Sequence, residues 1–497
     1  MNIRQRSLVL IFVMSITSTY GAEITESSLL KLAKKSNPTL AEIEASFLDS
    51  SVRADELSDK FGYEAYAGYN NEQTKEKSTI SFQPIFRSVN QYKLGVRKST
   101  KYGVLIDLNT SIDARSGDSE SGSDYKDLHT TIYELGFQFD LWKDFMGRIS
   151  KNQFDNLYDL KAKDELQKEI SAYAFESNVR KLYWTIVANN EKLEIMKRLN
   201  KTAKNQAADA VKRKRSSVAD KAEVARFKSL VHQRKGQLLS LEYEREMLFK
   251  NLRELFPNLN GQELKLGKYN LNKAFFEVLS CSAKIESTKE VPFESTKYDD
   301  ITKILNRVKN RQGKIDSTYD DLDLKFALTL KKVGVSSYAK STSYTEGSYQ
   351  GSLDDIDEND RSAMSAGIML TVPFGESKGS TATIKEKLTE KRFEASIDSM
   401  DAKVSSSHTQ VQKSVKLLSQ VIKEQKSNST QLDIRLKEMN KQYRQARIPE
   451  YVLIQDQDAL LQSDLNVIDT QLMIVNTILD YLAVFNEYDC AFNRKSL

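Results

Sequence analysis

The feature that most constrains this chain is the uneven placement of the residues that break helices. Residues 148–256 contain one glycine and no proline, and residues 380–497 contain no glycine and a single proline, Pro449. Eight glycines lie between residues 62 and 147, and seven more lie between residues 313 and 379. Because glycine and proline destabilise a helix interior, this order predicts two glycine-bearing blocks that alternate with two long helical blocks. The chain therefore shows an internal duplication of architecture, without obvious identity of residues.

Composition narrows the class of protein. Only 19 glycines and six prolines occur among 497 residues, which argues against collagen-like, mucin-like and flexible low-complexity chains. The 22 tyrosines and 21 phenylalanines are more aromatic residues than a disordered chain carries. The 74 basic and 69 acidic residues leave a net charge of +5, which is too balanced to predict nucleic acid as the main partner.

The first 22 residues have the pattern of a secretory signal peptide. Arg4 and Arg6 precede an apolar run over residues 8–14, and small polar residues lead to a cleavage site after Gly21 or Ala22. No later run approaches the roughly 18 consecutive apolar residues of a membrane-spanning helix. The exported protein is therefore expected to be soluble or to enter a membrane as a β-barrel, the other structure that satisfies every backbone group there.

Alternation of apolar and polar residues with period two predicts four strands in the glycine-bearing blocks. These strands cover residues 104–113, 133–141, 324–331 and 364–374. Each has one apolar and one polar face, as in a membrane barrel with lipid outside and water inside. An antiparallel sheet packed on a soluble core shows the same alternation, so the strands alone leave both interpretations open. The polar stretches 116–127 and 341–360 are predicted to be surface loops.

The two helical blocks have the pattern of long amphipathic hairpins. Apolar residues recur at three- and four-residue intervals, and glutamate and lysine fill much of the rest. The first block has one plausible turn in the basic cluster 212–217, and the second has one at 446–450, where Pro449 suits the start of a new helix. Residues 148–214 and 380–446 are each 67 residues long, or about 100 Å of helix. A hairpin of this length bridges a space or lines a conduit.

In this order, several short motifs resemble those of the TolC-type outer-membrane efflux proteins. Asn-Pro at 37–38 resembles the opening helix of that family, and Phe-Asp-Leu-Trp at 139–142 resembles its first junction between strand and helix. The segment 370–375, with its Val-Pro, resembles the second junction. Residues 443–461 resemble the periplasmic tip of the second hairpin, and residues 214–223 occupy the same place in the first. The resemblance covers nearly the whole chain after the signal peptide.

The resemblance implies a mixed α+β membrane protein that assembles as a homotrimer. Each chain would give four strands to one 12-stranded transmembrane β-barrel, continuous with a long periplasmic α-helical coiled-coil tunnel, with an internal twofold structural repeat. The expected segments are a signal peptide (1–22), an N-terminal periplasmic helix (23–61), barrel strands of repeat 1 (62–147), a helical hairpin with its tip near 212–218 (148–257), an equatorial belt segment (258–298), a helix that opens repeat 2 (299–322), barrel strands of repeat 2 (323–379), a helical hairpin with its tip near 446–450 (380–489) and a C-terminal equatorial tail (490–497).

The same resemblance places adaptor docking and a periplasmic gate at the hairpin tips. The candidate residues are Arg215, Ser217, Asp220, Arg447, Ile448 and Glu450. Asp220 matches an acidic position of the family, whereas Val452 stands at the corresponding place in the second repeat. The family usually has glycine at each tip, where Lys214 and Ala446 stand here. The chemistry of the gate is therefore expected to differ from that of familiar members.

The chain has two cysteines, Cys281 and Cys490. Two thiols so far apart in sequence do not by themselves establish a pair, even in an oxidising compartment. The resemblance places both residues in the equatorial belt, and a disulfide between them is therefore a hypothesis.

No motif of a catalytic or metal site occurs in the sequence. His129, His232 and His408 have no cysteine or carboxylate around them at metal-ligand spacing, and each is predicted to be a solvated helix or strand residue. The sequence also lacks a nucleophile elbow, a phosphate-binding loop and a dinucleotide fingerprint. We therefore expect no enzymatic activity and no cofactor.

The leading hypothesis is an outer-membrane exit duct of a tripartite efflux or type I secretion system. The resemblance implies that an inner-membrane pump passes substrate through a periplasmic adaptor into this duct, which lies in the outer membrane of a Gram-negative cell with its helical part in the periplasm. One alternative is a periplasmic or secreted coiled-coil scaffold with soluble β-domains. A second alternative is an adaptor or tether that binds pump components without forming a pore.

Overall fold

The computed structural model divides the chain into two units. The first comprises Met1–Ala45, Lys168–Asp299 and Asp401–Leu497, and the second comprises Ser46–Gln167 and Asp300–Met400. The structure describes residues 22–35, 37–75, 85–118, 124–217, 219–287, 296–319, 321–336, 349–372, 378–445 and 447–485, with Cys490 and Phe492. The expected signal peptide lies outside the described residues, apart from Ala22.

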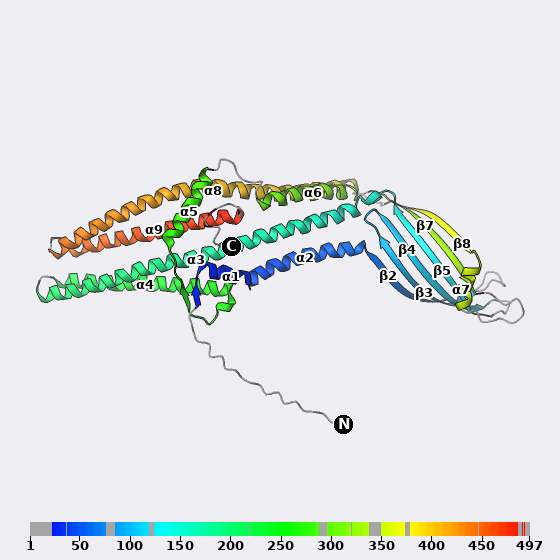
Figure 1. Ribbon diagram of the computed structural model, residues 1–497, viewed down its shortest axis with the longest axis horizontal. Helices are drawn as coiled ribbons and strands as arrows, with labels where there is room; N and C mark the ends of the chain where they lie inside the picture. Colours follow the sequence, from blue (N-terminus) through cyan, green and yellow to red (C-terminus); the bar gives the residue numbers. More distant parts are fainter. Residues whose placement is uncertain are drawn as a thin grey trace, which may run out of the picture. The chain divides into compact units, whose positions relative to one another are not determined.

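Four long helices form the two hairpins that the sequence predicts. The first hairpin consists of α3 (Ser150–Arg215, 66 residues) and α4 (Lys221–Leu255, 35 residues). The second consists of α8 (Lys378–Arg444, 67 residues) and α9 (Glu450–Val484, 35 residues). Figure 1 shows each pair turning back on itself. Helix α3 ends at Arg215 and α4 begins at Lys221, and α8 ends at Arg444 and α9 begins at Glu450, close to the turns predicted near 212–218 and 446–450.

Local chemistry explains where each hairpin turns. Ser217 has a positive φ of 59°, which ends the helical backbone of α3. Asp220 then caps α4, because its side chain accepts a hydrogen bond from the backbone N–H of Glu223. In the second hairpin Pro449 is extended, with φ −74° and ψ 155°, and it immediately precedes α9. A proline at this place sacrifices no helical hydrogen bond, because the first N–H groups of a helix have no intrahelical partner.

The N-terminal segment is two helices rather than the single helix expected over residues 23–61. These are α1 (Glu26–Lys35) and α2 (Pro38–Lys60). Pro38 has no backbone N–H and disfavours helical geometry in the residue before it, so the chain breaks there. The side chain of Asn37 accepts a hydrogen bond from the N–H of Thr39 and donates one to the carbonyl of Leu255 at 2.6 Å. This break therefore anchors the segment to the end of α4.

Short elements complete the first unit. Strand β1 (Ala22–Ile24) pairs in parallel with β6 (Leu264–Leu266), and the 3-10 helix η2 (Pro257–Leu259) follows α4. Helix α5 (Leu271–Ser287) packs against α9. The segment expected to form an equatorial belt, 258–298, thus includes most of these elements.

The second unit is built on one antiparallel sheet. Its strands, in spatial order, are β2 (Tyr63–Gln73), β3 (Ile85–Ser99), β4 (Val104–Asp118), β5 (Asp124–Asp140), β7 (Asp323–Val335) and β8 (Ser362–Thr371). Figure 1 shows that the sheet is curved. The remaining elements of this unit include the 3-10 helix η1 (Phe145–Gly147) and the helices α6 (Lys297–Ser317) and α7 (Tyr349–Glu358).

The expectation of four strands per chain is wrong, because the sheet has six. The four predicted strands correspond to β4, β5, β7 and β8, and the additional hairpin is formed by β2 and β3. In β2 the apolar face is marked mainly by Ala65 and Ala67, which are small, and Tyr66 interrupts the opposite, polar face. Pairing with β3 along all eleven residues of β2 stabilises a strand whose own alternation is weak.

Both predicted loops are also partly regular structure. Residues 116–127 were expected to be a loop, but β4 and β5 remain paired as far as Asp118 and Asp124. Part of 341–360 forms α7, whose Ser352 hydroxyl lies 2.8 Å from that of Thr131 on β5. Gly334 on β7 makes room for α7, because a side chain there would collide with the carbonyl of Ser352. Pairing and packing across the sheet thus override a polar, glycine-rich composition.

Helix α9 is the one described helix that is long and apolar enough to cross a membrane, judged by length and composition alone. More than half of its most apolar window, 56%, is buried inside the protein. Its Gln471 donates a hydrogen bond to Asn272 of α5 at 3.0 Å, and its buried Asp456 pairs with Arg435 of α8 at 2.9 Å. We therefore interpret α9 as a packed core helix.

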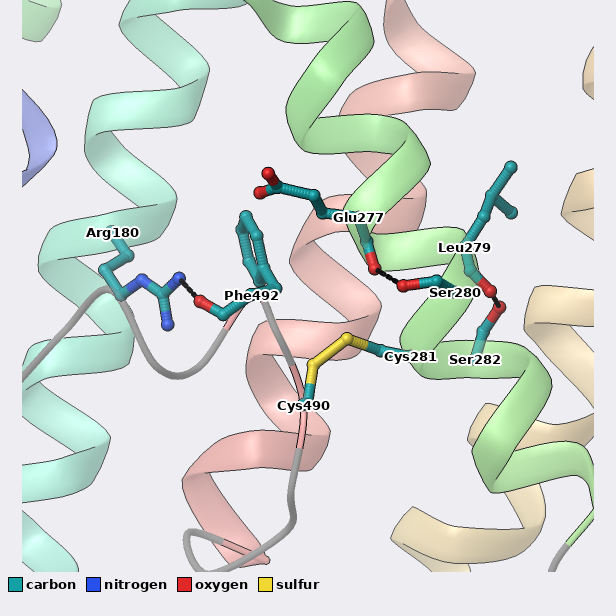
Figure 2. The surroundings of a disulfide bond; sticks show 8 residues. All are labelled: Arg180, Glu277, Leu279, Ser280, Cys281, Ser282, Cys490 and Phe492. Carbon is teal, nitrogen blue, oxygen red and sulfur yellow. Dashed lines mark hydrogen bonds between the residues drawn. A yellow bond between two sulfur atoms is a disulfide. The ribbon is translucent and has the colours of Figure 1, made fainter.

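A disulfide joins Cys281 of α5 to Cys490, 209 residues further along the chain. Figure 2 shows that Arg180 of α3 donates a hydrogen bond to the carbonyl of Phe492, at 2.8 Å. The guanidinium of Arg180 also lies 4.4 Å from the Phe492 ring centroid and pairs with Glu26 at 2.6 Å. The disulfide and Arg180 together hold Cys490 and Phe492 in the first unit.

Peptide mapping tests this disulfide. Without reductant, the protein is expected to yield a linked pair of peptides containing Cys281 and Cys490, which reductant separates. The Cys490→Ser variant should lack the linked pair and should be cleaved faster by protease near Phe492, because one of its two attachments is gone. Identical maps with and without reductant would rule out the bridge.

Candidate functional site

The ends of the two hairpins meet in an apolar cluster within the first unit. Its buried core comes from the first hairpin, and residues of both hairpins surround that core. The core residues are Ala203, Ala210, Val224, Phe227 and Leu230, and Ala207, Val211, Val231, Tyr443 and Ile454 pack against them. Because Tyr443 belongs to α8 and Ile454 to α9, this cluster joins the second hairpin to the first.

A polar network surrounds the Tyr443 side chain. Its hydroxyl donates a hydrogen bond to the Glu223 carboxylate of α4 at 2.5 Å, and its ring centroid lies 5.8 Å from that of Phe227. Arg213 of α3 pairs with the same carboxylate at 3.3 Å, and its guanidinium lies 4.7 Å from the Tyr443 ring centroid. Glu223 thus accepts contacts from both hairpins. We call Arg213, Glu223, Phe227 and Tyr443 the tyrosine contact.

Two ion pairs extend this connection between the hairpins. Arg226 of α4 pairs with Glu450, the first residue of α9, whose side chain is only 11% exposed. About two turns further along α4, the buried Arg234 pairs with Asp458 of α9. A buried charge that loses its partner costs far more than an exposed one, so separation of the hairpins is unfavourable unless water or another partner replaces these contacts.

The environment of Tyr443 keeps its phenol neutral. Burial, followed by the hydrogen bond to the Glu223 carboxylate, raises the pKa of Tyr443 above its usual value. A raised pKa in the folded state means that the contribution to stability is fully present below the unfolded pKa, near 10, and is lost as the pH rises through the raised value. The hydroxyl therefore remains a hydrogen-bond donor throughout the physiological range.

The structure gives the six predicted tip residues different environments. Glu450 is buried and contacts the other hairpin, whereas Arg215, Ser217 and Arg447 are exposed, and Ile448 is half-buried. Asp220, predicted as a gate acid, is exposed and caps α4. Of these six, Glu450 alone has a direct polar contact between the hairpins among the interactions of the described residues.

Sequence reasoning missed the partners that make the connection. No sequence pattern marks Glu223, Arg226 or Tyr443 as a contact between the hairpins, and Arg213 stands out only as part of the basic cluster 212–217. Asp220 followed three residues later by Glu223 is a recognisable signal for a helix start, but it gives no hint of a partner 220 residues away. His408 was expected to be solvated and is instead buried, with its ring 3.3 Å from the Tyr481 hydroxyl.

The sheet of the second unit has an inverted polarity. One row of directly paired residues crosses all six strands on its apolar face: Ala65, Val96, Leu108, Leu135, Leu330 and Met364. Several of these side chains are largely exposed, including Leu108 at 58% and Met364 at 73%. Other exposed residues on the same face are Tyr63, Tyr69, Tyr92, Leu94, Tyr133, Ile368 and Leu370.

The opposite face of the sheet is mainly polar, and on β4 it is more shielded. Asn109, Ser111 and Asp113 of β4 are all buried, although they point to this face. Glu134 of β5 pairs with Lys331 of β7 at 2.9 Å on the same face. The buried side chains on this face of β4 are thus polar. A soluble sheet shows the reverse, with its apolar face buried and its polar face solvated.

The described residues contain no group of three or more histidine, cysteine or acidic side chains that could hold a metal ion.

No family model matches this chain, and no curated protein sequence matches it either. Solved structures do match it over nearly its whole length. The outer membrane protein VceC of Vibrio cholerae has a TM-score of 0.61 at 12% identity, covering 93% of this chain and 96% of its own. The CmeC outer membrane channel of Campylobacter jejuni has a TM-score of 0.62 at 11% identity, covering 99% and 94%. The open state of the MtrE outer membrane channel of Neisseria gonorrhoeae has a TM-score of 0.60 at 11% identity, covering 94% and 90%.

Hydrogen–deuterium exchange tests the tyrosine contact. The Tyr443→Phe substitution removes one hydrogen bond, worth about 1 kcal/mol, and is expected to speed amide exchange at both hairpin ends about fivefold. The matched control is Tyr451→Phe, because Tyr451 lies on α9 near the same turn and is 55% exposed. Equal exchange in the two variants would show that the Tyr443 hydroxyl does not hold the hairpins together.

Proposed function

Because this chain has the fold of the TolC-type outer-membrane efflux proteins, we propose that it forms an outer-membrane exit duct. The chain would act as a homotrimer whose sheets form a transmembrane β-barrel and whose hairpins form a periplasmic coiled-coil tunnel. The observation that carries this proposal is the inverted polarity of the sheet. The matching limbs of the two hairpins, 66 and 35 residues against 67 and 35, support a twofold internal repeat.

The exposed apolar face supports the proposal that this side of the sheet contacts lipid. Soluble monomers rarely expose large contiguous apolar patches, yet this face carries exposed leucine, isoleucine, methionine and tyrosine side chains across the sheet. In hydrocarbon the same face has no hydrophobic penalty, and the opposite polar face can line a water-filled lumen. The alternative of a soluble coiled-coil scaffold offers nothing to cover this face.

The hairpin ends are the proposed site of adaptor docking and gating. The exposed Arg215, Ser217 and Arg447 are available to a periplasmic adaptor, and Asp220 and Ile448 lie beside them at the turns. The tyrosine contact and the pair between Arg226 and Glu450 hold the second hairpin against the first. Opening would therefore require these contacts to break as the hairpins shift.

The proposed location is the outer membrane of a Gram-negative cell, with the helical part in the periplasm and residues 1–22 removed as a signal peptide. An inner-membrane pump would drive the substrate, and the adaptor would connect the pump to this duct in a tripartite efflux or type I secretion system. The channels with this fold are not enzymes, and no catalytic step or cofactor enters the proposal.

Extraction and mass measurement separate this proposal from its alternatives. A duct is expected to stay in the membrane through carbonate washing and to emerge in detergent as a trimer. Release by carbonate without detergent would favour the scaffold, and a membrane-bound trimer without conductance would favour the tether.

Single-channel recording in planar bilayers tests the gate. The double variant Arg226→Gln with Tyr443→Phe is expected to raise the open fraction at least fivefold, because two contacts of about 1 kcal/mol or less each favour the closed arrangement. Tyr451→Phe again serves as the control and should behave as the unmodified protein. A conducting channel whose open fraction is the same in all three would contradict the gate but not the duct.

A further inference from the structure

The six-stranded sheet is incomplete as a channel wall. In the described part of the chain, β2 and β8 are its two edges, and each has one side without a strand partner. Lipid offers no hydrogen bonds to edge N–H and C=O groups, so an open sheet edge does not persist in hydrocarbon. A wall that faces lipid therefore needs another strand at each edge.

We propose that β2 of one copy pairs antiparallel with β8 of the next copy, and that three copies close a barrel of 18 strands. This inference rests on the proposed trimeric duct and specifies how its wall closes. It replaces the 12-stranded barrel that the family resemblance implies, because three copies of a six-stranded sheet supply 18 strands. The lumen exists only when each chain contributes an edge to its neighbour.

Strand direction permits this closure. The six strands alternate in direction without a crossover, so the first and the last run antiparallel. An even number of strands per copy keeps this alternation intact around the ring. The two edges are also matched in length, since β2 has 11 residues and β8 has 10.

The two faces of the sheet restrict the register. On β2 the apolar face carries the odd-numbered residues, such as Ala65 and Tyr69, and on β8 it carries the even-numbered residues, such as Ile368 and Leu370. A shift by one residue moves a whole strand to the wrong face. Only registers that place odd residues of β2 opposite even residues of β8 keep both apolar faces in lipid.

The offset between the ends of neighbouring strands selects one of these registers. A line of direct partners from Tyr63, the first residue of β2, crosses the sheet to Ala366 of β8, five residues before the end of that strand at Thr371. The strand ends thus shift by an average of one residue per pairing over the five pairings, which corresponds to a tilt of about 35°. Transmembrane barrels have tilts of about 35–45°.

One further step of the same size places Tyr63 of the next copy opposite Val372. In this register Thr371 lies opposite Glu64, and Ser362 lies opposite Gln73. Every residue of β8 then has a partner on β2. The two edges therefore match in direction, face, tilt and length.

Side-chain size also fits this register. On the lipid face it sets Ala65 opposite Leu370, and Tyr69 opposite Ala366, so that a small residue meets a large one. On the lumen face it sets Gly68 opposite Gly367.

The predicted barrel is wide. With about 4.8 Å between strands and a tilt of about 35°, 18 strands give a backbone diameter of about 34 Å, against about 22 Å for 12 strands.

Cysteine cross-linking tests the register in the full-length protein. Tyr69→Cys with Ala366→Cys probes the lipid face, and Asn70→Cys with Ser365→Cys probes the lumen face. Both pairs are needed because hydrogen-bonded and non-hydrogen-bonded positions alternate, and the two types differ in spacing. Mild oxidation of the membrane-bound protein is expected to link neighbouring copies through at least one pair, with a covalent trimer as the largest species on a non-reducing denaturing gel.

Two matched controls locate the register. Tyr69→Cys with Met364→Cys lies on the same face but two residues away, and Tyr69→Cys with Gly367→Cys lies on opposite faces. Each is expected to give less than a tenth of the product of the predicted pairs. Strong linkage through Met364→Cys, with none through either predicted pair, would overturn the register.

The number of chains and strands in the ring is measured on the unmodified protein. The result therefore does not depend on whether the cysteine variants fold. Native mass measurement of the detergent-solubilised protein should give three chains, and electron cryomicroscopy should show 18 strands. Two chains with 12 strands, or three chains whose barrel excludes β2 and β3, would overturn the proposal while leaving a conducting duct intact. A protein that neither stays in the membrane nor conducts would instead refute the proposed function.

Discussion

The constraint on which the rest of this structure depends is the polarity of its sheet. Exposed apolar side chains cover one face, and buried polar side chains crowd the other. Transmembrane barrels have the same arrangement, in which the apolar face meets hydrocarbon and the polar face meets water. Lipid also requires every backbone group to have a partner, so the membrane position that we propose for the sheet demands that its edges be closed.

The helical hairpins are held together by contacts of a different kind. Their ends are joined by an apolar cluster, a tyrosine hydrogen bond and two ion pairs that each have one buried partner. These contacts act together, because most of them join the same two hairpins. A network of weak contacts can hold a closed arrangement and still release it when a partner competes for a few of its members.

The sequence predicted the parts of this fold that depend on local signals. Scarcity of glycine and proline located both hairpins, Pro449 marked one turn, and strict alternation identified β4, β5, β7 and β8. Strand β2 was missed because its stability comes from pairing with β3 rather than from its own pattern. The contact between Tyr443 and Glu223 was also missed, since a pair separated by 220 residues leaves no local trace.

Fluorescence quenching by lipids with brominated acyl chains tests the central claim that the apolar face of the sheet meets lipid. Leu108 and Asn109 are neighbours on β4 that point to opposite faces, so each can be replaced by tryptophan in the reconstituted protein. Measured against the background of the two native tryptophans, Leu108→Trp should be quenched strongly and Asn109→Trp hardly at all. Equal quenching of the two, or none at Leu108→Trp, would contradict the account.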